Sequence, residues 1–529
     1  MPIHLRHHVF AKERLVAFSD AVFAIIATIM VIPLKIPEFV TDGANFNLED
    51  YIINSDFALQ VAIYYLAFYL VWDAWLSHCR VFHILEHVDD FVTFLNLVAL
   101  LFISLLPASI SLVSSYPEDS LALTIAFLNI LLISIAMFFL VFFAVRQTQM
   151  LDSLIVEAVK VRTLKWTLYA PLLINPLIAL LAIIFAWGVT DQPKIGIITL
   201  FMIIPFNFLA RFILKKIQVR YLRKRVIYLT NEDEGIFCLI NNFVSKERTL
   251  ALSDGVFSII GTLIVLDLTA DIYKKEGKAT EATDFLKEEQ YAFYSYFSSF
   301  MIAGLLWFIH HSMFSLISAV NSYITIFNGL SLMFLGLIPF GAGVASSFID
   351  GTNTNNEITS VRIMVALIIL ASLSQLALWS VAHCEKSKCL SNEVNSHMIE
   401  FIQLWKLLIF PFTGLLVYLV SFSSGVTLNH FYTYFTFAVP VLFILPRAML
   451  FLMTRIKCFT TKASEERPVS AVSDLRYSRI QIQNEPADTT GLIYNQHDNN
   501  YLTTDTFKKL PGSTTSVDGG TITEEVQIV

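Results

Sequence analysis

The sequence predicts an all-α membrane protein of two homologous six-helix repeats, with about 12 transmembrane helices and both repeats in the same orientation. Apolar residues form 56% of the 529 residues and charged residues 15%, whereas soluble domains have about 45–50% and about 25%. Twelve apolar segments approach the roughly 20 residues that a spanning helix needs. A polar motif occurs once in each half. This composition excludes an ordinary soluble enzyme, and the net charge of −7 does not suggest nucleic-acid binding.

The apolar segments fall into two sets of six. They lie near residues 14–35, 56–82, 90–115, 121–145, 166–189 and 195–214, and then near 248–268, 290–316, 324–349, 360–382, 400–422 and 430–454. We therefore divide the chain into a cytosolic N-terminus (1–13), a first repeat (14–215), a cytosolic linker (216–246), a second repeat (247–455) and a cytosolic tail (456–529). Six is an even number, so the repeats share one orientation and are related by an axis along the membrane normal.

Lysine and arginine collect around the N-terminus, after the fourth helix, in the linker and after the last helix. Loops on the opposite side are acidic or neutral, so the positive-inside rule places both termini in the cytosol. The tail is polar and its composition predicts disorder. It contains Tyr477-Ser-Arg-Ile480, a pattern that sorting adaptors can bind, although plain disordered sequence is the alternative.

The duplicated motif opens each half. Residues 12–31 read KERLVAFSDAVFAIIATIMV, and residues 246–265 read KERTLALSDGVFSIIGTLIV. Further along, Trp75, His78 and Asn96 correspond to Trp307, His310 and Asn328. Apolar composition alone would not repeat polar residues in register, so the halves are duplicated units.

The first helix of each repeat carries a narrow stripe at a spacing of four residues. In the second repeat the stripe is Asp254, Ser258 and Thr262, and in the first it is Asp20, Ala24 and Thr28. Ile25 and Ile259 lie beside these stripes. Polar groups facing lipid are costly, so the stripes should face protein or water. Close helix packing and the lining of a pore both explain them.

Charged residues and histidines mark one end of these helices, and we expect them to form ion pairs and hydrogen bonds. Direct ion binding and proton sensing remain alternatives. The residues are Arg14, Ser19, Asp20, Arg248, Ser253, Asp254, His78, His310 and His311.

Four further polar residues have no place in this cluster. Asn96 and Asn328 are expected to satisfy backbone groups near proline kinks. Asp267 could place negative charge at the far, luminal mouth, with simple helix-end solvation as the alternative. Asp73 has Leu305 opposite it in the second repeat, so it has no symmetric role.

Several familiar signatures do not occur in the sequence. There is no T-V-G-Y-G filter, which disfavours a re-entrant selectivity filter, and no G-x-x-x-x-G-K-[ST] loop for ATP. Neither a catalytic constellation nor a set of metal ligands stands out, so we expect no enzyme activity, no metal and no cofactor.

The cluster carries a resemblance to a known family. Arg14-x-x-x-Phe18-Ser19-Asp20 resembles the R-x-x-x-F-S-D signature of the transmembrane protein 175 family of endolysosomal potassium channels. The second copy has Leu252 in place of the Phe. Gly304-Leu-Leu-Trp-Phe-Ile-His-His-Ser312 is similar to the second-repeat motif of that family, and the resemblance covers residues 12–455.

This resemblance implies a homodimer whose pore is surrounded by the first helix of each repeat. It implies that Ile25 and Ile259 form a hydrophobic constriction, with Thr28, Thr262 and Ser258 as polar lining. Ala24 stands where the family often has Ser. The implied partners are potassium ions, protons and membrane lipid, and the tail could serve a kinase or a sorting adaptor.

The resemblance favours a potassium-selective channel of endosomes and lysosomes that sets organelle membrane potential and pH. A proton leak channel and a proton-coupled secondary transporter are the alternatives. The charges cluster at helix ends rather than near the midplane, which is unlike the pattern of many transporters.

Overall fold

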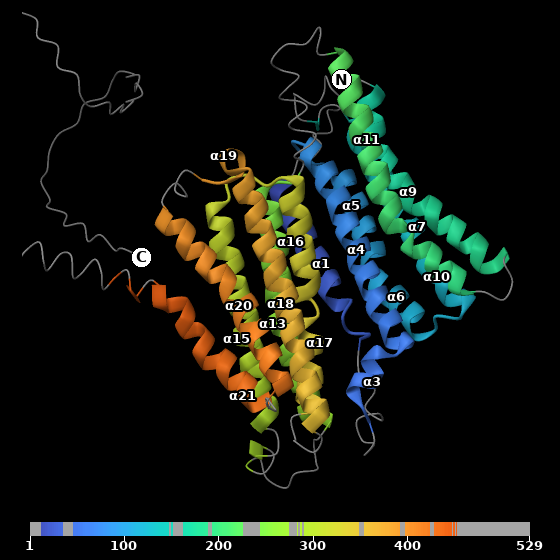
Figure 1. The fold of residues 1–529 in the computed structure, drawn as a ribbon. Coiled ribbons are helices and arrows are strands. Elements are labelled where there is room, and N and C mark those ends of the chain that lie inside the picture. Colours follow the sequence, from blue (N-terminus) through green and yellow to red (C-terminus); the bar gives the residue numbers. More distant parts are fainter. Residues whose placement is uncertain are drawn as a thin grey trace, which may run out of the picture. The chain divides into compact units, whose positions relative to one another are not determined.

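A computed structural model describes most of the chain up to residue 451. The described residues are 12–34, 46–147, 150–151, 162–188, 193–225, 244–274, 283, 286–287, 290–348, 354–391, 397–423, 428–446, 448–449 and 451. Every named element in this part of the chain is helical (Figure 1). Most of the predicted linker and the whole tail beyond residue 451, including Tyr477 and Ile480, lie outside the described residues.

The helices of the first half follow the predicted order. They are α1 (Lys12–Ile29), α3 (Leu48–Ile53), α4 (Ser55–Ile84), α5 (Asp90–Ser104), α6 (Leu106–Ser115), α7 (Ser120–Arg146), α9 (Arg162–Gly188), α10 (Pro193–Phe201) and α11 (Ile203–Arg225).

The second half repeats this order. Its helices are α13 (Lys246–Lys274), α15 (Gln290–Leu316), α16 (Ser322–Leu335), α17 (Ile338–Ser347), α18 (Thr354–Cys384), α19 (Lys386–Cys389), α20 (His397–Ser423), α21 (Leu428–Thr433) and the π-helix η3 (Tyr434–Ala438).

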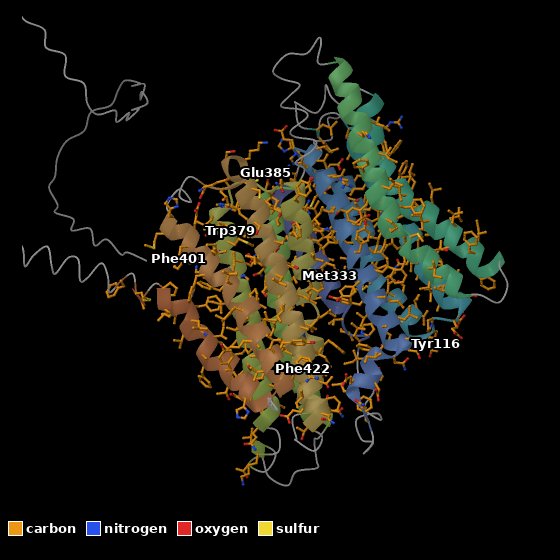
Figure 2. The ribbon with its side chains drawn as sticks, viewed as in Figure 1. Tyr116, Met333, Trp379, Glu385, Phe401 and Phe422 are labelled. Carbon is orange, nitrogen blue, oxygen red and sulfur yellow. The ribbon has the colours of Figure 1, made fainter. Side chains whose placement is uncertain are left out.

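The predicted fold class, an all-α membrane protein of two repeats, is confirmed. Among the described residues, 8 helices are long and apolar enough to cross a membrane, and shorter apolar helices lie at Leu172–Phe185, Ile197–Ala210 and Tyr434–Pro446. Large apolar side chains are exposed on these helices, as at Phe401 and Phe422 of α20 (Figure 2). Such exposure suits contact with lipid acyl chains rather than water. The predicted domain boundaries stay a prediction.

The predicted third and ninth segments are each divided into two helices, α5 with α6 and α16 with α17. A proline stands near the start of the second helix of each pair, where its missing N–H costs no intrahelical hydrogen bond. The first helix of each pair begins with the same cap: Asp89 accepts from the Val92 N–H, and Asn321 accepts from the Ile324 N–H, both at 2.8 Å. The duplication therefore extends to helix caps and breaks.

Two close approaches join the repeats. A Cβ atom on Gly255 of α13 would lie 2.8 Å from the Cβ of Ala24 on α1, and one on Gly329 of α16 would lie 2.6 Å from the ring of Trp72 on α4. Glycine is thus needed at both positions for the backbones to approach. Nearby, the Tyr64 hydroxyl donates to the Met333 carbonyl at 2.7 Å.

At the opposite end of α4 from Trp75 and His78, the repeats are joined by a side chain. Asn356, at the start of α18, accepts from the Leu48 N–H and donates to the Phe46 carbonyl, both at 2.9 Å. The ring of Phe46 also stacks on Phe348. The segment before α4 is therefore held against the second repeat.

Replacing Gly329 by alanine is expected to destabilise the packing between the repeats, because the new methyl group would overlap the Trp72 ring. Overpacking of this kind costs about 1–3 kcal/mol. The measurement is the midpoint of thermal unfolding of the purified chain in detergent. The double variant Trp72→Leu/Gly329→Ala should be less destabilised than the sum of its single variants. Additive losses would contradict this packing.

Candidate functional site

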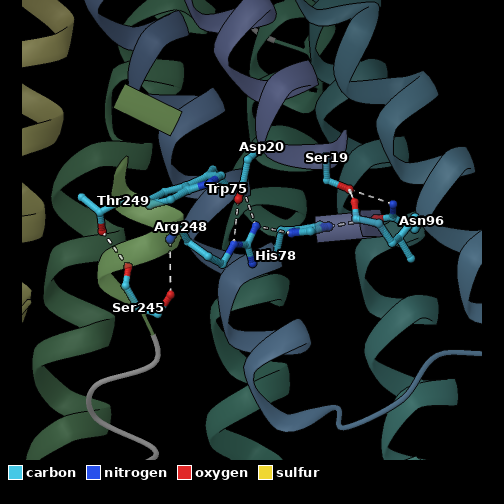
Figure 3. A network of polar contacts seen from close by, with 9 residues as sticks. Ser19, Asp20, Trp75, His78, Asn96, Ser245, Arg248 and Thr249 are labelled. Atoms are coloured by element: carbon cyan, nitrogen blue, oxygen red, sulfur yellow. Dashed lines mark hydrogen bonds and ion pairs between the residues drawn. The ribbon is translucent and has the colours of Figure 1, made fainter. Parts of the chain in front are cut away.

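The duplicated motif places a buried ion pair between α1 and α13. The Asp20 side chain is 1% exposed, and its carboxylate accepts from Arg248 Nη2 at 2.5 Å and from Arg248 Nε at 3.1 Å (Figure 3). Trp75 Nε1 on α4 also donates to Asp20, at 2.8 Å. A charged group inside a membrane protein needs such partners, and here a guanidinium fork supplies two of them.

A directed chain of hydrogen bonds continues from Arg248 to the backbone of α1. Arg248 Nη2 lies 2.9 Å from His78 Nδ1, and because a guanidinium can only donate, Nδ1 is the acceptor. The proton of His78 is therefore on Nε2, which donates to Asn96 Oδ1 at 2.9 Å. Asn96 then donates to Ser19 Oγ at 2.9 Å, and Ser19 donates to the Leu15 carbonyl at 2.8 Å. The bonds fix His78 as a neutral imidazole of one tautomer.

The second repeat builds the same chain without an arginine. Trp307 Nε1 donates to Asp254 at 2.8 Å, His310 Nε2 bonds Asn328 Oδ1 at 2.9 Å, and Asn328 donates to Ser253 Oγ at 2.9 Å. His310 Nδ1, however, is buried with no hydrogen-bond partner among the described residues. Asp254 is exposed, whereas its counterpart Asp20 is buried.

Arg14 is the residue of the first repeat that corresponds to Arg248. It is exposed on α1 and makes no ion pair with any described residue. An arginine and an aspartate six residues apart point about 120° apart around one helix, so Arg14 cannot reach Asp20 as Arg248 does. We expected ion pairs within this cluster of residues, and the described residues form one of them. It joins Arg248 of the second repeat to Asp20 of the first, rather than two residues of the same motif.

Sequence reasoning missed or misplaced several members of this network. Trp75 and Trp307 were noted only as markers of the repeat, although each donates to an aspartate. The expectation that Asn96 and Asn328 satisfy backbone near the proline kinks is wrong, since each links a histidine to a serine. The signal was their repetition in register with that histidine and serine. His311 is outside the chain of bonds, because its ring stacks on Trp307 instead.

The stripe residues of α1 and α13 differ in their surroundings. Thr28 is buried and donates to the Ala24 and Ile25 carbonyls, at 3.0 and 2.8 Å. Ser258 and Thr262 are exposed and donate to the Gly255 and Ile259 carbonyls, at 3.0 and 2.8 Å. Each hydroxyl group therefore donates its proton to a carbonyl of its own helix, and its oxygen stays available as a hydrogen-bond acceptor.

The two isoleucines and Asp267 complete the predicted set. Ile25 is 44% exposed, and Ile259 is half-buried against the core. The backbone of Asp267 belongs to α13, and its side chain lies outside the described residues. No group of three metal-ligating side chains occurs within the described ranges.

The fold and this network define a class of protein: a duplicated all-helical membrane protein whose first helices pair through a buried arginine and aspartate. The family described as "Endosomal/lysosomal potassium channel TMEM175" matches both halves of the chain, at residues 14–107 and 248–339. Both repeats of the chain are therefore similar to the TMEM175 family, and the resemblance predicted from the sequence is confirmed.

Individual relatives extend this match to most of the chain. An endosomal/lysosomal proton channel TMEM175 from Gallus gallus is 28% identical over 70% of this chain and 73% of its own length. The protein of the same name from Homo sapiens is 27% identical over 87% of this chain and 90% of its own length. A potassium channel from Streptomyces collinus is 27% identical over 25% of this chain and 62% of its own length.

Replacing Arg248 by methionine is expected to destabilise the fold strongly, because the Asp20 carboxylate would stay buried without its cation. Breaking a buried pair from one side costs about 3–5 kcal/mol. The measurement is again the thermal unfolding midpoint in detergent. Adding Asp20→Asn to Arg248→Met should recover part of the loss, since no uncompensated charge then remains. A double variant no more stable than Arg248→Met would contradict the pairing.

Proposed function

We propose that the chain forms a passive cation channel of endosomal and lysosomal membranes, with a pore surrounded by α1 and α13 from two copies of the chain. Potassium is the proposed ion, and proton leak through the same pore is the second candidate. One observation carries this proposal. Within the chain, α1 and α13 contact each other through different faces, and each helix leaves exposed the face that corresponds to the contact face of the other.

α1 has two faces of this kind. Its Asp20 and Ala24 side contacts α13, through Arg248 and Gly255. A second face, which includes Ala21 and Ile25, is exposed. At 100° per residue the centres of these faces lie roughly 90° apart around the helix. That is the angle at which a helix at the corner of a four-helix square meets its two neighbours.

α13 has the same faces with their roles exchanged. It contacts α1 through Arg248 and Gly255 and exposes Asp254, Ser258 and Thr262. The exposed stripe of α13 corresponds to the side that α1 has already used. Two copies related by a two-fold axis would therefore join both exposed faces and close a ring of four helices.

Charge supports the same partner. In a second contact built like the first, Arg14 of one copy would take the place that Arg248 takes within the chain. It would meet Asp254 and the buried Nδ1 of His310 in the other copy, both of which are short of a donor among the described residues. An exposed arginine and an exposed aspartate at a membrane boundary are costly alone, and the pairing would remove both costs.

Side-chain size supports it as well. Within the chain, the large Trp72 fills the space beside Gly329. At the proposed contact between copies, the corresponding residues are Gly304 and Leu97. A Cβ atom on Gly304 would meet no heavy atom of another described element within 4 Å, and Leu97 is 46% exposed. The large and small partners are exchanged, so a second copy would fit Leu97 against Gly304.

Ile25 and Ile259 are the proposed hydrophobic constriction of this pore. Both lie one residue beyond the stripe, and Ile25 is exposed on the second face of α1. Apolar rings of this kind close a pore by excluding water. Thr28, Thr262 and Ser258 are the proposed polar lining and selectivity residues, and the signature network would hold the four helices during gating. Asp267 is proposed at the luminal mouth.

The names of the relatives support both potassium and protons as the conducted ion. The full-length relatives are named proton channels and the family description names potassium, as do the bacterial relatives. A channel rather than a coupled transporter or an enzyme is the activity common to these names. We propose an endolysosomal location on the same ground, with both termini in the cytosol and the tail open to a kinase or sorting adaptor.

The test is electrical. Purified chain in planar bilayers, with potassium on one side and sodium on the other, should give a current that reverses near the potassium equilibrium potential. In the same bilayers Ile25→Asn and Ile259→Asn should raise the current several-fold, because an amide lets water wet the constriction. Ile25→Leu and Ile259→Leu, which keep the constriction apolar, are the controls.

Each result has a definite meaning. A reversal potential that follows an imposed pH gradient instead would make this chiefly a proton leak. No current in any condition would overturn the channel and favour a transporter. Asparagine variants with unchanged conductance and selectivity would remove the isoleucines from the pore.

The dimer has its own prediction. Arg14→Glu should reduce the fraction of dimer in detergent, measured by size exclusion with light scattering, because two like charges would face each other across the seam. Arg14→Glu/Asp254→Arg restores opposite charges and should restore the dimer. Arg146→Glu, at the exposed end of α7, is the matched control and should leave it unchanged. Failure of the double variant to recover any dimer would argue against this pair.

A further inference from the structure

The second half of α11 carries a concentration of positive charge that the proposed pore does not use. Seven of the 15 residues at 211–225 are lysine or arginine and none is acidic, whereas the whole chain has a net charge of −7. These residues follow one another along a single helix, because α11 continues to Arg225. A local positive field of this kind attracts an anionic partner.

Two ordinary explanations account for only part of this charge. Cations in the last turn of a helix interact favourably with its dipole, but Lys216 and Arg220 precede that turn. Membrane orientation requires some positive charge on the cytosolic side, yet the second repeat ends with only three such residues among 447–461. Lys216 and Arg220 also repel each other, since they stand four residues apart on one helix. An anion bound beside them would remove that cost.

The contacts of α11 show which of its sides is covered. Ile203 and Asn207 are buried, and Asn207 Nδ2 donates to Asn175 Oδ1 of α9 at 2.6 Å. Asn175 Nδ2 donates in turn to Asp73 Oδ2 of α4 at 3.0 Å. This side of α11 therefore packs against α9 and is tied through it to the rest of the first repeat.

The opposite side of α11 is exposed. At 100° per residue, Phe212 and Lys216 lie roughly 180° around the helix from Ile203 and Asn207. Both are exposed, Phe212 at 62%, and Lys216 Nζ lies 5.6 Å from the centre of the Phe212 ring. Positions 220 and 223 continue the same side, because spacings of three and four residues keep positions on one helical face. We call this side the basic face of α11: Phe212, Lys216, Arg220 and Arg223.

A membrane surface matches this face better than a soluble anion does. Just before the basic stretch, Phe208 and Leu209 are exposed, which suits lipid acyl chains. Within the stretch, Ile213 and Ile217 are exposed beside the cations. Apolar side chains next to lysine and arginine are typical of helices at the boundary between acyl chains and headgroups. The change from apolar to basic residues therefore places the basic face at the level of the headgroups.

We propose that the basic face of α11 binds the phosphate groups of anionic phospholipids in the membrane around the chain. The ammonium group of Lys216 pairs with phosphate oxygens, and the arginines that follow on the same side add guanidinium groups, which suit phosphate in a bidentate manner. Phe212 lies against the upper part of the acyl chains. The leaflet is the cytosolic one in the orientation that the sequence predicts. Neither the pore nor the dimer enters this inference, so it can hold or fail without them.

Spin-labelled lipids test the proposal in a membrane. The full chain in phosphatidylcholine vesicles should immobilise spin-labelled phosphatidylserine more than spin-labelled phosphatidylcholine, as measured by electron paramagnetic resonance. About 1 M salt should remove most of this preference, because it screens exposed charges. Lys216→Gln/Arg220→Gln should lower the relative association constant of phosphatidylserine several-fold, since each lysine or arginine near an anionic membrane surface contributes about fivefold.

Two further variants separate charge from other effects. Lys216→Arg/Arg220→Lys keeps both charges and should keep the preference for phosphatidylserine. Arg146→Gln/Lys388→Gln removes two exposed cations from α7 and α19 and should leave most of the preference in place. The thermal unfolding midpoint of each variant in detergent shows that it is folded.

A photoreactive analogue of phosphatidylserine locates the contact, because its crosslinks to the full chain can be mapped to peptides. We expect crosslinks within residues 211–225 that are lost in Lys216→Gln/Arg220→Gln. Crosslinks confined to other peptides, or no preference for phosphatidylserine in the wild-type chain, would overturn the site. A preference that appears only after Glu232, Asp233 and Glu234 are replaced by their amides would also overturn it, because the chain's own acidic segment would then be the partner of this face.

Discussion

The buried pair of Arg248 and Asp20 is the interaction on which the rest of the arrangement depends. It joins the two repeats at the helices that carry the duplicated motif, and it sets how far α1 and α13 can slide past each other. The same guanidinium donates to His78 and so determines the direction of every hydrogen bond as far as the α1 backbone. Because the pair is buried, removing either partner would leave a charge in a setting with little water to solvate it. One ion pair therefore holds both the contact between repeats and the protonation state of a histidine.

Duplication explains why this interaction leaves the single chain incomplete. A contact between unlike faces of two similar helices always leaves one face of each unused. Within the chain, α13 supplies the arginine and α1 the aspartate, so the arginine of α1 and the aspartate of α13 remain exposed. A closed ring is the arrangement that uses every face, and with two helices per chain the smallest ring that encloses a path has four. The geometry of the contact thus supports the proposed dimer, independently of what the relatives are named.

The sequence was sufficient for the fold class, the two repeats and the charged, serine and histidine members of the network, because hydrophobic length and a repeated polar motif are local signals. It did not assign the tryptophans and asparagines their hydrogen-bond partners. The breaks near Pro107 and Pro339 were readable in the same way, since proline favours the first turn of a helix. The pairing of Arg248 with Asp20 could have been predicted in part. Six residues along one helix place Arg14 and Asp20 on different sides, so the sequence indicates that the partner of Asp20 comes from another helix. The contact of Asp73 with Asn175 could not, because it depends on how α9 packs against α4 and no periodicity encodes that.

The positions at which the repeats differ separate two kinds of change. Within the chain, the large Trp72 packs beside Gly329. Their counterparts at the proposed contact between copies are Gly304 and Leu97, so there too a small residue lies opposite a large one and both contacts can be filled. Phe18 is exposed where its counterpart Leu252 is buried within the chain, which again assigns the larger side chain to the open seam. These differences compensate for each other. The difference between Asp73 and Leu305 is of another kind: a partner of the Asp73 carboxylate is Asn175 on α9 of the same repeat, so this difference lies outside the contact between the repeats.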